Sequence, residues 1–218
     1  MNKAYILIFL LVFLFSSCAT SPVKTEGRGA KETSLTKSEA KSLEVFNEIL
    51  ALPSSSDNME AVLKEKERLY KKIITSYPET PLAQESYWRL IASYVNDYSP
   101  PVYEKAELLY MEFLKKYPDS AFKDFADEEL GKSYYGNKEW GRLLSLTSPV
   151  FINYVKTGKR PVPLMAYLYA EANFNLGNYK DAEEGFSEAL KLFPKLSNAE
   201  KIKSRLDEIA IKKNKPVQ

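Results

Sequence analysis

Two kinds of residue in this chain have side chains that could do chemistry: its acidic residues and its single cysteine. Adjacent acids such as Glu128 and Glu129 could serve as the paired carboxylates of a glycosidase. The chain has no histidine, which excludes a Ser/His/Asp or Cys/His nucleophile and removes the commonest general base and metal ligand. Most acids alternate with basic residues, as in Glu65 to Arg68, which is typical of solvated helix faces. We therefore expect a protein that is not an enzyme and holds neither metal nor cofactor.

The chemistry of Cys18 depends on the segment before it. After Lys3 the chain is apolar from residue 4 to residue 15, which is the pattern of a secretory signal and is too short for a membrane span of about 20 apolar residues. Ser16 and Ser17 then lead directly to Cys18. A plain signal peptide that happens to end near a cysteine is the alternative interpretation.

Residues 1–18 resemble a bacterial lipoprotein signal peptide with its lipobox. The resemblance implies that the Cys18 sulfur takes a diacylglyceryl group, that residues 1–17 are removed, and that the new amino group is acylated. Several acyl chains on one residue would anchor the protein stably, because a single chain binds a membrane only marginally. The mature protein is thus expected to be anchored to a membrane and not to span it.

Residues 18–37 are rich in Thr, Ser, Gly, Pro and Lys and contain few apolar residues. This composition predicts a flexible tether that separates the acylated cysteine from the folded body. The whole chain has 31 basic and 29 acidic residues, and this near-neutral balance argues against a nucleic acid as its main partner.

From residue 38 onward the sequence repeats itself, most clearly in the unit 163–196. Gly177 permits a tight turn between two helices, and Pro194 ends the second one. The key residues follow one another at spacings of 2, 3, 4, 3 and 5, which are those of a tetratricopeptide repeat: Gly177, Tyr179, Ala182, Phe186, Ala189 and Pro194. In this pattern the alanines mark a close helix contact and Phe186 fills the space between the helices.

Three weaker units hold the same phase, at 38–79, 82–119 and 121–157, and a terminal helix is expected over 197–213, where Ser197 and Glu200 form a capping box. Pro149 falls inside the second helix of the third unit, so a kink or break is expected there. The predicted fold is all-α: a tetratricopeptide-repeat solenoid of about four helix pairs with a C-terminal capping helix.

The segments YPETPLAQESYWRL and YPDSAFKDFADEELGKSYY resemble the linkers between repeats in bacterial envelope lipoproteins of the BamD type. They share a Tyr-Pro helix end, a short polar turn and an Ala-rich next helix, and the resemblance covers residues 59–195 together with the lipobox. Proteins of that type are outer-membrane lipoproteins on the periplasmic face that bind other proteins of the machinery inserting β-barrel proteins. With about four units instead of their usual five, this chain is interpreted as a diverged relative of them. Ala19, where some inner-membrane lipoproteins have an aspartate, also favours the outer membrane.

Two groups of alternatives stay open. The same style of repeat occurs in a coordinator of the Tol-Pal system and in pilus-assembly lipoproteins, so the pathway is not assigned. A cell-wall enzyme or a peptidoglycan-binding module is the rival from another class, with Glu128 and Glu129 as its acids.

In tetratricopeptide proteins the first helices line a concave groove that binds peptides or partner proteins. By that register the groove residues here are Arg89, Phe125, Glu128, Lys132, Tyr135, Leu164, Tyr167, Glu171 and Phe174. The competing interpretation is that half of them contact the neighbouring repeat. Basic residues exceed acidic ones from Lys191 to Lys215, which suits contact with anionic lipid or an acidic partner, or a solvated terminal helix.

Overall fold

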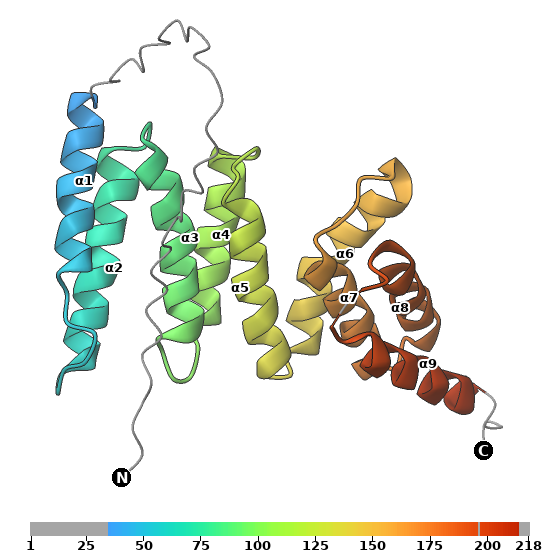
Figure 1. The fold of residues 1–218 in the computed structure, drawn as a ribbon. Helices are drawn as coiled ribbons and strands as arrows, with labels where there is room; N and C mark the ends of the chain where they lie inside the picture. The colour runs from blue at the N-terminus through green and yellow to red at the C-terminus, as the bar shows by residue number, and fades with distance from the viewer. Residues whose placement is uncertain (1–34, 196, 214–218) are drawn as a thin grey trace, which may run out of the picture. The chain divides into compact units, whose positions relative to one another are not determined.

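The computed structural model describes residues 35–195 and 197–213, and within these ranges the chain is all-helical (Figure 1). The predicted signal peptide, Cys18, almost all of the predicted tether and Leu196 lie outside the described residues. Among the described helices, none is both long and apolar enough to cross a membrane. The helices are α1 Lys37–Leu50, α2 Met59–Ser76, α3 Pro81–Asn96, α4 Tyr103–Lys116, α5 Lys123–Gly136, α6 Trp140–Thr157, α7 Pro163–Asn175, α8 Tyr179–Leu192 and α9 Ala199–Lys213.

Local sequence explains where several of these helices begin. Thr36 and Glu39 form a capping box at α1, in which the Thr36 side chain accepts from the Glu39 N–H at 3.2 Å. Asn58 caps α2 by accepting from the N–H of Ala61. Both α3 and α7 have a proline near their start, where the missing N–H leaves no hydrogen bond unmade.

Most helices pack against the next helix along the chain. Successive helices contact each other in the pairs α1/α2, α2/α3, α3/α4, α5/α6, α6/α7, α7/α8 and α8/α9. Odd-numbered helices also contact the next odd-numbered helix, α1 with α3, α3 with α5 and α5 with α7. This arrangement confirms the all-α class and makes one face of the odd helices a continuous layer within residues 35–195.

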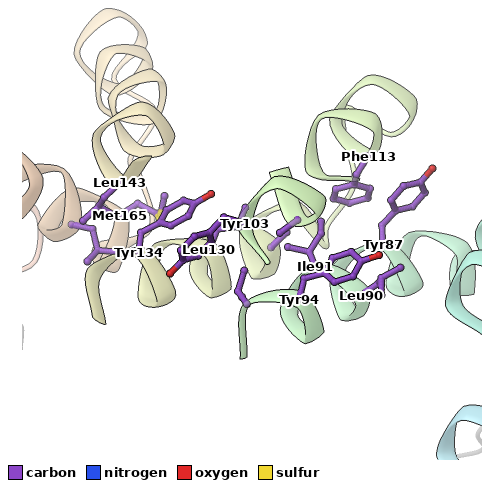
Figure 2. Close-up of a cluster of buried hydrophobic side chains, with 14 of the residues drawn as sticks. Tyr87, Leu90, Ile91, Tyr94, Tyr103, Phe113, Leu130, Tyr134, Leu143 and Met165 are labelled. Atoms are coloured by element: carbon purple, nitrogen blue, oxygen red, sulfur yellow. The ribbon is translucent and has the colours of Figure 1, made fainter. Parts of the chain in front are cut away.

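Aromatic side chains fill the core between these helices (Figure 2). Tyr87 of α3 stacks on Phe113 of α4 with ring centroids 5.4 Å apart. Tyr103 of α4 packs against Tyr134 of α5 at 5.0 Å, and the Tyr134 hydroxyl donates to Glu107 at 2.7 Å. The Tyr134 hydroxyl thus finds an acceptor, which is the condition for placing a tyrosine in a core.

The pair α7/α8 follows the predicted repeat pattern closely. Gly177 has a φ of 82°, a left-handed conformation that glycine adopts without steric cost. Ala182, Phe186 and Ala189 are fully buried on the α8 face. The predicted turn and the predicted close contact are therefore confirmed, and α7 and α8 are held together by small residues on either side of one phenylalanine.

The helix is not broken at Pro149, although the sequence predicts a kink or break there. The helix α6 runs without a break from Trp140 to Thr157. Proline inside a helix costs about 3 kcal/mol, but buried residues on both sides hold this helix in place. Thr147 is fully buried, and Phe151 stacks on Tyr169 of α7 with centroids 4.1 Å apart. Tertiary packing outweighs the local penalty.

Candidate interaction surface

One stripe of α5 carries four of the nine predicted groove residues. Phe125, Glu128, Lys132 and Tyr135 are three or four positions apart, so they lie on the same helix face. The neighbouring helix α3 contributes Arg89 to this surface, since α3 and α5 pack side by side (Figure 1). The prediction that residues of first helices share one surface agrees with this placement.

An aromatic cluster lies where α3 meets the start of α5, and we call Trp88, Phe122, Phe125 and Arg89 the open cluster. Trp88 stacks on Phe122 with centroids 5.8 Å apart and lies 5.1 Å from Phe125. The Arg89 guanidinium lies over the Trp88 ring at 4.9 Å, within the range of a cation–π contact. Phe125 is 52% exposed, so a large apolar side chain reaches the surface here.

Ion pairs surround the open cluster on both helices. Arg89 donates to Glu85 at 2.6 Å. Lys132 lies 3.1 Å from Glu128 and 3.7 Å from Glu129. The two carboxylates considered for acid–base chemistry therefore share a lysine. In residues 35–195 and 197–213 no group of three acidic or metal-ligating side chains is placed to hold a metal ion.

The other half of the predicted groove is covered by the chain itself. Tyr167, Glu171 and Phe174 of α7 are buried, and Leu164 is half-buried against the core. The prediction that these residues are free for a partner is wrong. Tyr135 is also contacted from outside α5, because the Lys201 amine donates to its hydroxyl at 2.5 Å.

The covering element is α9. Ile202 and Ile209 are fully buried, and Leu206 packs on the core between them, so one face of α9 is an apolar stripe. Basic residues beside that stripe reach over α7: Lys201 and Arg205 both approach Glu171, at 3.6 and 3.4 Å. The excess of basic residues near the C-terminus was the sequence signal for this contact, but the sequence did not show which acid they meet.

Burial and charge shift the pKa values of the groups under α9. Burial, a hydrogen bond with Tyr135 and the nearby Glu171 raise the pKa of Tyr167 far above its usual range. Burial by itself disfavours the charged form of Arg205, yet the carboxylates of Glu171 and Glu208 outweigh it and raise the pKa of the guanidinium. Arg205 is thus firmly charged where it meets Glu171.

A separate pocket of about 350 Å³, lined by both charged and apolar side chains, lies between the start of α5, the second half of α6, the loop after it and the start of α7. Asp127 lines it and is only 2% exposed. Lys123 and the Tyr110 hydroxyl both donate to this carboxylate. Burial raises the pKa of Asp127 although Lys123 opposes the shift. The buried carboxylate of Asp127 is therefore satisfied by Lys123 and Tyr110 within the fold.

A comparison with family models, with curated proteins and with solved structures finds no match for this chain.

Proposed function

We propose that this protein is a non-catalytic scaffold of the tetratricopeptide type, which binds other proteins. Two features of the fold support the repeat assignment. Each expected unit, 38–79, 82–119, 121–157 and 163–196, contains one pair of successive helices. The contacts α1/α3, α3/α5 and α5/α7 are those expected of stacked helix pairs.

We further propose that the scaffold is a lipoprotein, held through Cys18 at the periplasmic face of the bacterial outer membrane. The lipobox resemblance and Ala19 support this placement. The partners would be envelope proteins or peptides, in a role like that of BamD-type proteins in outer-membrane protein assembly. Neither a cell-wall enzyme nor a polysaccharide-binding module has a specific geometric feature in its favour among the described residues.

The observation that carries the binding proposal is the open cluster. A phenylalanine that is 52% exposed beside Trp88 and Arg89 leaves apolar surface uncovered in the isolated chain. Tryptophan and arginine dominate the energy of protein interfaces, because they combine a large contact area with directional polar groups. A partner that covers Phe125 would bury this surface between α3 and α5.

Replacing Phe125 and Arg89 together by alanine is expected to reduce partner capture by tenfold or more, because hot-spot residues each contribute about 2 kcal/mol or more. The measurement is photo-crosslinking in intact cells from a probe at position 132, with quantitative mass spectrometry of the captured proteins. The matched control is Leu108→Ala on α4, which is also an exposed apolar side chain but lies outside the open cluster.

Two results of this experiment would contradict the proposal. One is an unchanged crosslinking yield in the Phe125→Ala, Arg89→Ala variant with its helix content intact. The other is a loss of capture in Leu108→Ala that equals the loss in the double variant.

Cys18→Ser is expected to move the protein from the membrane fraction to the soluble fraction, since serine cannot form the thioether that carries the diacylglyceryl group. The measurement is fractionation of cells grown with a labelled fatty acid, followed by immunodetection. The native chain in the same cells is the control. Retention of the label in the Cys18→Ser chain would show that the lipobox assignment is wrong.

A further inference from the structure

Under α9 lies a buried carboxylate with an unusual set of partners. The Glu171 side chain is 1% exposed. The Tyr167 hydroxyl donates to it at 2.8 Å. Its two cationic partners both come from α9, four residues apart on that helix: Lys201 and Arg205. A buried acid requires such cations, because an isolated charge away from water is strongly unfavourable.

Aromatic rings surround the two cations of α9. The Arg205 guanidinium lies 4.2 Å from the centre of the Phe174 ring. The Lys201 amine lies 5.2 Å from the Tyr135 ring and 5.6 Å from the Tyr167 ring. Three rings on two helices thus form a cage for positively charged side chains above one carboxylate.

The cations of α9 stand at long hydrogen-bond distances from Glu171. Charge-assisted hydrogen bonds are usually about 2.7 to 2.9 Å long, whereas Arg205 approaches Glu171 to 3.4 and 3.5 Å and Lys201 to 3.6 Å. Arg205 also divides its guanidinium between Glu171 and Glu208 of its own helix, at 3.3 Å. A ligand whose cations came closer to Glu171 would form stronger charge-assisted hydrogen bonds with this carboxylate.

The cage is continuous with the surface proposed to bind partners. Tyr135 is the last residue of the α5 stripe that starts at Phe125, and the Lys201 amine donates to its hydroxyl. A helix lying along this stripe from the open cluster would reach the edge of α9. Its binding and the binding of α9 would then exclude each other at Tyr135.

We propose that Tyr135, Tyr167, Glu171 and Phe174 form a binding site for a basic amphipathic helix of another protein, with two cationic side chains four residues apart, and that α9 occupies this site in cis until that helix displaces it. This inference rests on the proposed scaffold function. The chemistry of the site defines the class of ligand. One carboxylate and three aromatic rings suit two cations, and the ligand helix must also carry an apolar stripe like that of Ile202 and Ile209 in α9.

The test uses the mature chain with Cys18→Ser and a specific protease site inserted after Lys195, so that the fold forms before α9 is cut free. The probe is a fluorescent helical peptide that keeps only Lys201, Ile202, Arg205, Leu206 and Ile209 of α9 in an otherwise unrelated sequence. The peptide is expected to bind the cut chain and to bind the uncut chain at least about tenfold more weakly, because α9 in cis has a high effective concentration.

The charges are tested separately from the apolar stripe. Replacing both peptide cations by glutamine is expected to weaken binding by at least about tenfold. Glu171→Gln in the cut chain should give the same loss, and the two changes together should give no further loss. Equal binding to the cut and the uncut chain would overturn the proposal. A loss of less than about tenfold on replacing the two peptide cations would also overturn it. Concentration-dependent dimers of the uncut chain would overturn it too, because the occupant would then be α9 of a second copy.

If the cut chain loses its fold, a second measurement on the uncut chain tests the same proposal. In the uncut chain, Glu171→Gln is expected to speed hydrogen exchange of the α9 amides at least about tenfold relative to those of α3. Unchanged exchange in α9 would overturn the role of Glu171. The open cluster lies outside these variants, so capture through Phe125 with failed peptide binding would reject this site and leave the scaffold function standing.

Discussion

Phe186→Ala is expected to lower the free energy of unfolding by about 3 to 5 kcal/mol, which is the usual loss when a buried phenylalanine leaves a cavity. Phe186 is fully buried and meets Tyr167 and Phe174 of α7 at centroid distances of 6.3 and 6.5 Å. No neighbouring helix can move into the gap, because Ala182 and Ala189 already bring α8 close to α7. Urea denaturation of the mature chain with Cys18→Ser, followed by circular dichroism, measures the change.

The same substitution at an exposed site provides the control. Phe125→Ala is expected to cost about 1 kcal/mol or less, because that ring is 52% exposed and leaves little cavity. Equal losses at positions 125 and 186 would contradict the packing described for α7 and α8. This control also shows whether Phe125→Ala leaves the fold intact for the binding experiment.

Gly185→Val is expected to lower the free energy of unfolding by about 3 kcal/mol, the upper end of the range for overpacking a core. A Cβ atom at position 185 would lie 3.0 Å from the Cβ of Ala170 and 2.9 Å from the Tyr169 ring. Ala170 cannot yield, since its Cβ is fixed to the α7 backbone. The two extra methyl groups of valine must therefore push α7 and α8 apart. Thermal and urea unfolding both measure the loss.

Gly141→Val is the matched control for this prediction. Gly141 also lies within a helix, but a Cβ there would meet no atom within 4 Å. We expect its unfolding free energy to stay within about 0.5 kcal/mol of the native value. A large loss in both variants would show that the contact with α7 is not its cause, and a small loss in both would show that α7 and α8 are less closely packed than the structure has them.

The unit at α7 and α8 shows how far sequence patterns lead. The spacing from Gly177 to Ala189 predicts the turn, the helix contact and the buried Phe186, and all three are present. Gly185 carries no such signal, because a glycine within a helical stretch can equally face solvent. Only its distance to Ala170 reveals that it lies at the closest approach of the two helices.

Pro149 shows the opposite case, in which the tertiary structure prevents the helix break that a local signal allows. The local rule for proline predicts a kink or a break, and the break is absent because α6 continues past Pro149 to Thr157. The decisive contact is the stacking of Phe151 on Tyr169, a residue of the next helix. The energy of that contact does not appear in any short window of sequence.

The sequence by itself determined the all-α class, the positions of the helices, and which residues of α5 and of α7 lie on one face of their helix. Helix periodicity and turn chemistry act within a few residues of the chain, so they can be recognised in the sequence. It could not determine which of those faces stays open. Lys201 meets Tyr135 across 66 positions of sequence, and Arg205 meets Glu171 across 34. Whether a side chain is exposed depends on what packs over it from elsewhere in the chain, so only the tertiary structure divided the predicted groove into an open cluster at Phe125 and a carboxylate covered by α9.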